Sequence, residues 1–143
     1  MNLAGENLPQ LLQKARENSI ACVRPVLAEF GFTEQQWRVL KVLDTFGELS
    51  AQDIATESCI LSPSLSRILA RLETDGFLLK KSDSADQRAL VIKLSAKGKR
   101  ICKKITPLIE QQYKKLSRSM GQKTIINLVS VLREFNQLEG GRT

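Results

Sequence analysis

Hydrophobic residues recur every three or four positions through most of the chain, which is the repeat of one face of an α-helix. Over residues 8–30 this stripe consists of Leu8, Leu12, Ala15, Ser19, Cys22, Val26 and Phe30. Pro25 lies within the stripe and predicts a kink or a restart, and Gly31 predicts the end of the helix. Similar stripes after Ser95 and Gly121 predict two further helices in the last third of the chain.

The middle of the chain predicts shorter helices with their own start and stop signals. Residues 33–36 have the spacing of a capping box, and residues 50–53 open the segment "SAQDIATES". Ser62 followed by Pro63 is typical of an N-cap and the first helical position, and Gly76 predicts the end of that helix after Asp75. Two short helices joined by the tight turn "CIL" match a helix-turn-helix.

A β-hairpin is predicted next, with "FLLKK" and "ALVIKL" on either side of "SDSADQR" and with Leu90, Ile92 and Leu94 facing inward. The fold class is therefore mainly α, a winged helix-turn-helix with a small hairpin wing. We expect one domain over 1–143, with a DNA-binding lobe at 32–95 and dimerisation helices at 1–31 and 96–143. The apolar stripes of these outer helices exceed what one small core can bury, and the wing module has its own core, which together favour a homodimer. Packing of these stripes within one chain is the alternative.

Positive charge is concentrated in one region of the sequence. The net charge is +7, and residues 80–104 hold nine basic and two acidic residues, so the rest of the chain is neutral. Such a zone favours binding to a phosphate polymer, because neutralised phosphates release their counterions. The alternative is an ordinary solvated face.

Enzymes and metal-binding proteins are disfavoured, because the sequence lacks the residues and motifs typical of their sites. The chain has no histidine, and its cysteines, Cys22, Cys59 and Cys102, are too far apart for a CxxC site. No GxGxxG or P-loop pattern occurs. We therefore expect no enzyme activity, no metal and no cofactor. No apolar run approaches the roughly 20 residues of a membrane span, and no signal peptide is present, so a cytoplasmic protein without membrane contact is predicted.

The helix after "CIL" divides into two faces. The apolar residues Leu65, Ile68, Leu69 and Leu72 point one way, and Ser64, Arg67 and Arg71 point the other way, flanked by Ser66. Arginine can donate two hydrogen bonds to guanine in the major groove, and serine can pair with several bases. The predicted contacts to double-stranded DNA are Ser62, Pro63, Ser64, Ser66, Arg67, Arg71 and Lys80. A solvated helix face is the alternative.

The order of elements resembles the MarR family of bacterial transcription regulators over almost the whole chain. The family's wing signature, D-x-R followed by L-[ST]-x-x-G, is found as Asp86, Arg88, Leu94, Ser95 and Gly98. Within the family, "RPVLAEFGFTEQQWRVL" and "CILSPSLSRILARLETDGFL" are similar to regulators of homoprotocatechuate (aromatic acid) degradation operons.

This resemblance implies a repressor that leaves a palindromic operator when a small aromatic carboxylate binds. It also implies that Arg88 enters the minor groove, where negative potential is concentrated, and that Asp86 keeps the hairpin tip in shape. Ser62 and Arg67 depart from the subgroup's pattern, so the operator sequence is not carried over with the resemblance.

The same resemblance places the ligand between the outer helices and the DNA-binding lobe. The candidate effector-binding residues are Arg16, Arg24, Trp37 and Arg38. Arg16 lies beside the apolar stripe, where its guanidinium could bind a carboxylate, and Trp37 offers a flat apolar wall. A surface ion pair for Arg16 and a core role for Trp37 are the alternatives.

Two other classes of function stay open. One is a thiol-based oxidant sensor that uses Cys22, as some relatives use a cysteine near the N-terminus. Those relatives surround the thiol with tyrosines, whereas this chain has only Tyr113, and Cys22 falls on the apolar stripe where thiols are usually inert. The other is an architectural protein that binds DNA by charge alone, whatever its base sequence. The serine and arginine side chains on the polar face of the helix after "CIL" argue against this class.

Overall fold

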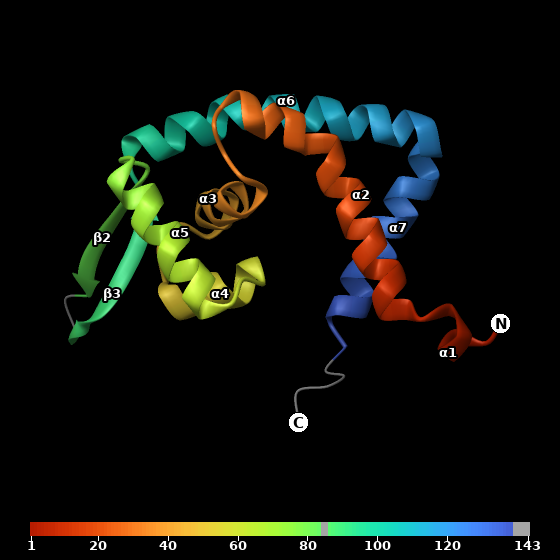
Figure 1. Cartoon of the computed structure of the whole chain (residues 1–143), viewed down its shortest axis with the longest axis horizontal. Coiled ribbons are helices and arrows are strands. Elements are labelled where there is room, and N and C mark those ends of the chain that lie inside the picture. Colours follow the sequence, from red (N-terminus) through yellow and green to blue (C-terminus); the bar gives the residue numbers. More distant parts are fainter. Residues whose placement is uncertain (84–85, 139–143) are drawn as a thin grey trace.

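The computed structural model describes residues 1–83 and 86–138 and has a long helix, α6, that joins two separate groups of elements (Figure 1). The elements in chain order are α1 (Leu3–Glu6), α2 (Leu8–Glu29), α3 (Glu34–Phe46), β1 (Leu49–Ser50), α4 (Ala51–Ser58), α5 (Ser62–Thr74), β2 (Leu78–Asp83), β3 (Asp86–Leu94), α6 (Ala96–Met120) and α7 (Gln122–Asn136). The lobe formed by α3 to β3 lies below one end of α6, and α7 with most of α2 lies below the other end. Within the described residues, no helix combines the length and the apolar character needed to span a membrane.

Of the two outcomes predicted for Pro25, a restart is not observed, because helix α2 continues through this residue as one element. The ribbon of α2 bends in its C-terminal half, drawn in orange (Figure 1). The helix ends at Glu29, and the predicted stop residue Gly31 follows two positions later with a φ of 76°, in the left-handed region. The amide of Phe32 donates to the carbonyl of Leu27 at 3.0 Å, which closes the last turn and brings both side chains into the core. The capping box of α3 is also confirmed, with the Gln36 amide donating to the Thr33 hydroxyl.

The wing is part of a three-stranded antiparallel sheet in the order β1-β3-β2. Strand β1 was not predicted, because two residues carry no alternating pattern, and it pairs Leu49 with Ile92. Ile92 and Leu94 face the core as expected. The prediction for Leu90 is wrong, since this side chain is 50% exposed. Leu90 pairs with Ser82 toward the hairpin tip, where the sheet extends past the helices that cover its base.

The start of α5 differs by one residue from the prediction. Leu61 occupies the N-cap position, and Ser62 and Pro63 are the first two helical residues, so the Ser62 side chain does not cap the helix. Proline is tolerated there because amides in the first turn have no partner within the helix. The helix ends at Thr74 rather than Asp75, and Gly76 has the expected left-handed conformation, with a φ of 83°.

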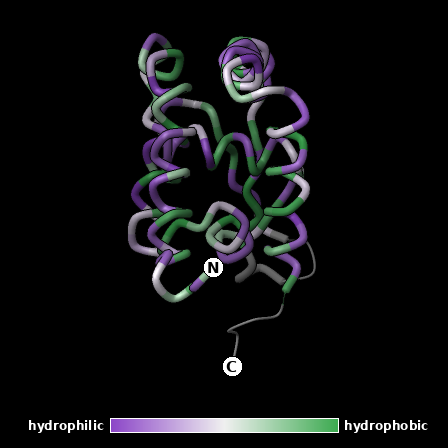
Figure 2. Tube along the Cα trace, turned by 90° about the vertical axis from the view of Figure 1, so that its right-hand side faces the viewer, coloured by the Kyte–Doolittle hydropathy of each residue, from purple (hydrophilic) through white to green (hydrophobic). Residues whose placement is uncertain are grey.

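The core is formed by the inner faces of the lobe together with the C-terminal part of α2 and the N-terminal part of α6. Its fully buried large side chains include Leu27, Leu40, Leu43, Ile54, Leu72, Leu78, Ile92 and Ile105. Helix α7, in contrast, has no buried residue. The ribbons of α2 and α7 overlap in Figure 1, but the turned view in Figure 2 shows them as separate columns that both carry hydrophobic residues.

A close contact fixes α6 to the turn between α5 and β2. The Ser95 hydroxyl accepts from the Gly98 amide at 3.0 Å and donates to the Gly76 carbonyl at 2.6 Å, and the Ser95 amide donates to the Phe77 carbonyl at 2.9 Å. A side chain at Gly98 would overlap the carbonyl oxygen of Phe77. The serine and glycine of the L-[ST]-x-x-G signature are thus required by this junction.

Gly98→Ala should lower the free energy of unfolding by about 2–3 kcal/mol, because backbone atoms must move to admit the methyl group. Chemical denaturation measures the effect. Gly5→Ala is the matched control, since a methyl group there meets nothing closer than 3.8 Å, and the change should be within about 1 kcal/mol. Equal stability of both variants would show that α6 does not depend on this contact.

Candidate nucleic-acid interface and ligand pocket

Helix α5 presents a polar face to solvent, as predicted. Leu65, Leu69 and Leu72 are buried in the core, and Ile68 is half-buried. On the other side, Ser62, Pro63, Ser66, Arg67 and Arg71 are exposed, and Ser64 is half-buried. The structure therefore brings the predicted residues of this helix onto one accessible surface.

The basic residues of this surface differ in their ion pairs. Arg71 contacts Asp75 at 3.0 Å, and Lys80 of β2 contacts Glu73 at 3.4 Å. Arg67 has no carboxylate oxygen within 4.0 Å among the described residues. Exposed ion pairs contribute little stability, so Arg71 and Lys80 can exchange their carboxylates for phosphates at small cost. Arg67 is the α5 cation that needs no such exchange.

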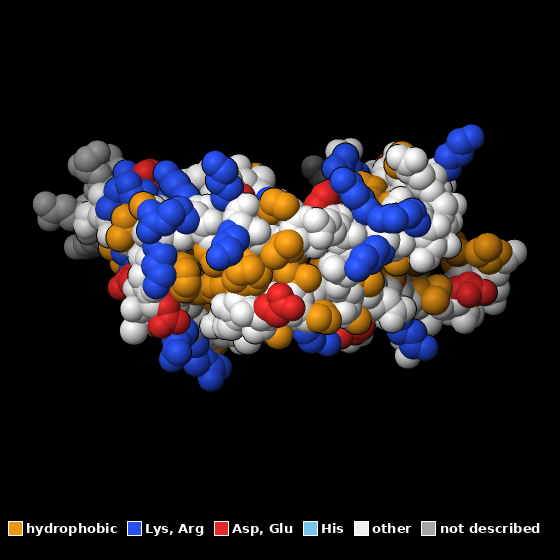
Figure 3. Space-filling view, turned by 90° about the horizontal axis from the view of Figure 1, so that it is seen from above, with side chains coloured by type: hydrophobic (Ala, Val, Ile, Leu, Met, Phe, Trp, Pro, Cys, Tyr) orange, Lys and Arg blue, Asp and Glu red, His pale blue; other side chains and the backbone are white. Residues whose placement is uncertain are grey.

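The hairpin adds positive charge beside α5. Figure 3, which views the molecule from the α6 side, shows Lys and Arg side chains around the end that carries the hairpin and also over the opposite half of the molecule. Lys81 contacts Glu48 at 2.8 Å, and this hydrogen bond lowers the pKa of Glu48 below its ordinary value. The backbone of Asp86 and Arg88 lies in β3, and their side chains lie outside the described part of the structure.

A second feature is a pocket of about 270 Å³ where α2, α3 and α6 meet, termed the effector pocket below. Its lining residues are Ile20, Val23, Glu34, Trp37, Arg38, Lys41, Val42, Thr45, Phe46 and Tyr113. Two of the four candidate effector residues, Trp37 and Arg38, line it. Arg16 does not line the pocket, but its guanidinium lies 3.3 Å from the carboxylate of Glu34, which does. The side chain of Arg24 is 61% exposed and lies 4.0 Å from Glu17.

Glu34 organises the cations around this pocket. One of its carboxylate oxygens, Oε2, lies 3.0 Å from Nη2 of Arg38 and 3.3 Å from Nη2 of Arg16. The other terminal nitrogen of Arg38, Nη1, donates to the carbonyl of Ser58 at 2.9 Å. Ser58 is the last residue of α4, directly before the turn that leads into α5. Arg38 thus connects the pocket with the approach to the recognition helix.

Sequence reasoning missed Glu34, Lys41 and Tyr113. Glu34 and Lys41 each lie three positions from one of the residues Trp37 and Arg38 and four positions from the other. This helical spacing could have placed them on the same face of α3. Tyr113 comes from a distant helix and gave no local signal. Burial raises the pKa of Tyr113 above its ordinary value, so its hydroxyl stays protonated at neutral pH and can donate a hydrogen bond.

The cysteines lie apart from one another. Cys102 is buried, and burial raises its pKa to about 12, so it remains a thiol at neutral pH. Cys22 is half-buried and donates to the carbonyl of Asn18 at 3.4 Å. Cys59 is exposed. The described part of the chain contains no group of three or more metal-binding side chains.

The MarR family model matches residues 32–90, which include the whole of α3, α4 and α5. The HTH-type transcriptional regulator FarR of Neisseria gonorrhoeae is 34% identical to this chain over 128 residues, which cover 90% of this chain and 88% of that protein. The chain belongs to the MarR family. It is a MarR-family transcriptional regulator with the predicted mainly α winged-helix fold.

One relative confirms the resemblance to regulators of homoprotocatechuate degradation operons, and one similar structure contains an aromatic acid. The homoprotocatechuate degradative operon repressor of Escherichia coli is 33% identical over 137 residues, which cover 96% of this chain and 93% of that protein. The crystal structure of NadR in complex with 4-hydroxyphenylacetate has a TM-score of 0.85 and is 31% identical, with 92% of this chain and 96% of NadR covered.

Arg67→Ala should relax discrimination between operator variants by about 1–3 kcal/mol at the base pair it contacts, with a smaller loss of non-specific affinity. The operator is first selected from random duplexes, and fluorescence anisotropy then measures binding to single-base variants. Arg100→Ala, an exposed cation on α6, is the control and should leave the ranking of variants unchanged. Equal losses on all sequences would make Arg67 a phosphate contact.

Proposed function

We propose that this MarR-family regulator is a homodimeric repressor whose palindromic operator is released when a small aromatic carboxylate binds the effector pocket. The observation that carries the proposal is the position of Arg38, which lines the pocket and also donates to the last carbonyl of α4. Two similar proteins support it, since one is an aromatic acid degradation repressor and NadR is seen with 4-hydroxyphenylacetate.

The dimer follows from hydrophobic surface that this chain leaves uncovered. Exposed apolar side chains on α7 include Ile126, Leu128, Val129, Val131 and Phe135, and the start of α2 adds Leu8 and Leu11. A helix of 15 residues with no buried face is marginal in water unless another surface covers it. A second copy provides that cover through residues 1–31 and 96–143, and its twofold axis places two lobes on a palindrome.

On DNA, α5 lies in the major groove and the wing beside it. Arg67 reads a base edge, supported by the short side chains of Ser64 and Ser66. Arg71 and Lys80 contact phosphates and set the register, and Arg88 in the wing enters the minor groove. Ser62 and Pro63 lie in the first turn of α5, which approaches the sugar-phosphate backbone of the DNA.

The ligand binds by replacing an internal carboxylate. Glu34 already occupies the guanidinium groups of Arg16 and Arg38, so a ligand carboxylate competes for the same donors. Trp37 forms an apolar wall, and the protonated Tyr113 can bond a ring hydroxyl. The volume of about 270 Å³ lies just below the usual range for small-molecule sites, which begins at about 300 Å³, and suits a single ring.

Release follows from the two roles of Arg38. When Arg38 turns toward the ligand, its hydrogen bond to Ser58 is lost, and the turn before α5 keeps only its packing contacts with α3. A ligand can shift the DNA-binding equilibrium only by its differential affinity for the two arrangements, typically about 1–3 kcal/mol. Release should therefore be partial at modest concentrations and reversible on dilution.

Titration with 4-hydroxyphenylacetate should change the fluorescence of Trp37, the single tryptophan, and weaken operator binding. Arg38→Ala should retain weakened ligand binding but lose the effect of the ligand on DNA, because the link to Ser58 is absent. Arg24→Ala, which removes an exposed arginine outside the pocket, should respond like the wild type. The proposed link would be contradicted if saturating ligand lowered the operator affinity of Arg38→Ala by the same factor as that of the wild type. If 4-hydroxyphenylacetate changes neither signal in the wild type, the ligand class is wrong.

Ile126→Glu should convert the dimer to a monomer and weaken operator binding, since a charge would have to be buried in the apolar interface. Sedimentation velocity measures the mass, and thermal denaturation tests whether the lobe stays folded. Ala51→Glu adds the same charge to an exposed position of α4 and should remain a dimer. A dimeric Ile126→Glu variant would place the interface elsewhere.

A further inference from the structure

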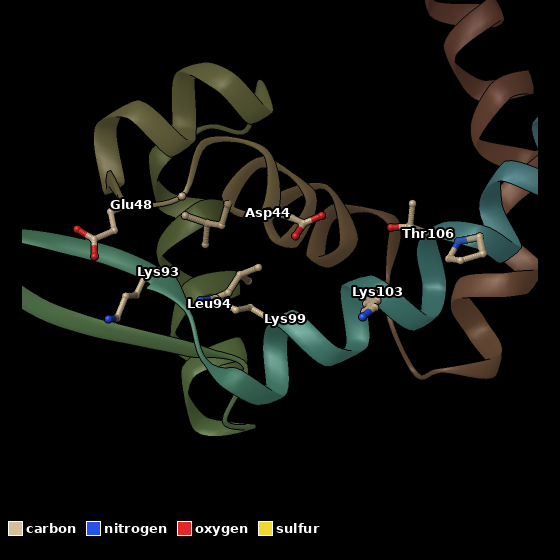
Figure 4. A pocket seen from close by; sticks show the side chains of 10 residues that line it. Asp44, Glu48, Lys93, Leu94, Lys99, Lys103 and Thr106 are labelled. Carbon is tan, nitrogen blue, oxygen red and sulfur yellow. The ribbon is translucent and has the colours of Figure 1, made fainter.

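A second cavity, of about 610 Å³, lies between α3, β3 and α6, and we refer to it as the wing-base cavity. Its lining residues are Leu43, Asp44, Gly47, Glu48, Lys93, Leu94, Lys99, Lys103, Thr106 and Pro107, none of which lines the effector pocket. Figure 4 shows Glu48 and Lys93 at its β3 end and Thr106 at the opposite end, along α6. The function proposed above makes no use of this cavity.

The cavity has three cations without carboxylate partners. Lys99 and Lys103 lie one turn apart on the same side of α6, and Lys93 comes from β3. In the described part of the chain, no carboxylate oxygen lies within 4.0 Å of any of their ammonium groups.

The two carboxylates that line the cavity are already paired with lysines that do not line it. Asp44 contacts Lys41 at 3.4 Å, and Glu48 contacts Lys81 at 2.8 Å. Lys93 also interacts with Glu48 and helps to lower its pKa, so Lys99 and Lys103 are the lining cations that the described carboxylates leave uncompensated. An anion that enters the cavity finds ammonium groups on both the β3 and the α6 sides.

The lining of the cavity combines apolar residues with polar groups at both ends. Leu43 and Leu94 are buried core residues, and Pro107 adds the flat side of its ring. The Thr106 hydroxyl is buried and has no hydrogen-bond partner among the described residues. Pro107 has no amide hydrogen, so the carbonyl of Lys103 lacks its usual helical partner. A buried hydroxyl without a partner is costly, which favours a ligand that bonds it.

We propose that the wing-base cavity binds an amphipathic anion with a larger apolar body than a single-ring acid, such as a fused-ring or long-chain carboxylate. Its carboxylate contacts Lys99 and Lys103, its body packs on Leu43, Leu94 and Pro107, and a second polar group can reach Thr106. The volume lies within the range of about 300–1,000 Å³ for small-molecule sites and is more than twice that of the effector pocket.

The test measures binding of 2-naphthoate to the full chain by isothermal titration calorimetry. The double variant K99Q/K103Q should bind at least about tenfold more weakly, since hydrogen bonds to charged groups are lost. The matched control R100Q/K104Q removes the same charge from neighbouring positions of α6 that do not line the cavity, and should bind like the wild type. All four side chains are exposed, so both variants should fold.

Three further measurements distinguish binding in the wing-base cavity from non-specific charge attraction and from binding in the effector pocket. The neutral analogue 2-naphthamide should bind the wild type about tenfold more weakly than 2-naphthoate and should not distinguish the two double variants. Thr106→Val keeps the shape of the side chain and should leave naphthoate binding intact, because naphthoate carries no second polar group. Saturating 4-hydroxyphenylacetate should not displace naphthoate, whether or not it affects DNA binding.

Equal affinity of K99Q/K103Q and the wild type would overturn the proposal, and so would displacement by 4-hydroxyphenylacetate or an absence of naphthoate binding. None of these outcomes depends on operator release. The failure of this proposal can thus be distinguished from failure of the proposed repressor function.

Discussion

The close approach of α6 to the turn between α5 and β2 sets the geometry on which both candidate ligand sites depend. Gly98 can lie against the Phe77 carbonyl only because it has no side chain, and Ser95 holds the same turn through two hydrogen bonds. From this point α6 supplies Lys99, Lys103 and Thr106 to one cavity and Tyr113 to the other, and then leads to α7. A small change in the angle of α6 would alter both sites and the position of α7 together.

The elements were largely predictable because their signals are local. The capping box at Thr33, the left-handed glycines and the alternating hairpin all act within a few residues. The wrong prediction for Leu90 arises because a local pattern carries no information about tertiary packing. Alternation placed Leu90 inward, but only the tertiary position of the helices decides how far along β3 the core extends. The polar side of α5 could be read from helical spacing, whereas the effector pocket needs Tyr113 from a distant helix, and the wing-base cavity needs three elements to meet.

The ion pairs around Glu34 favour a switching role over a purely stabilising one. The side chains of Glu34 and Arg38 are only 19% and 22% exposed, so both charges lose hydration when they pair. Pairs of this kind add little net stability, but removing one partner is costly. A ligand carboxylate that replaces Glu34 keeps the guanidinium groups paired throughout. The exchange keeps the guanidinium charges compensated, but the displaced Glu34 carboxylate must turn toward solvent to regain hydration. The binding energy of the ligand has to offset this displacement and the loss of the hydrogen bond between Arg38 and Ser58.

The two cavities contact different parts of the DNA-binding surface. In the proposed mechanism the effector pocket acts through Arg38 on the turn before α5, whereas the wing-base cavity includes Lys93 of the wing itself. Ligand binding at either site affects operator affinity only if the site differs between the free and DNA-bound arrangements, and linkage then requires DNA to change ligand affinity by the same factor. Because α3 and α6 line both cavities, a shift of α6 that opens one site also moves a wall of the other. Two ligands that favour the same position of α6 would bind cooperatively without touching each other.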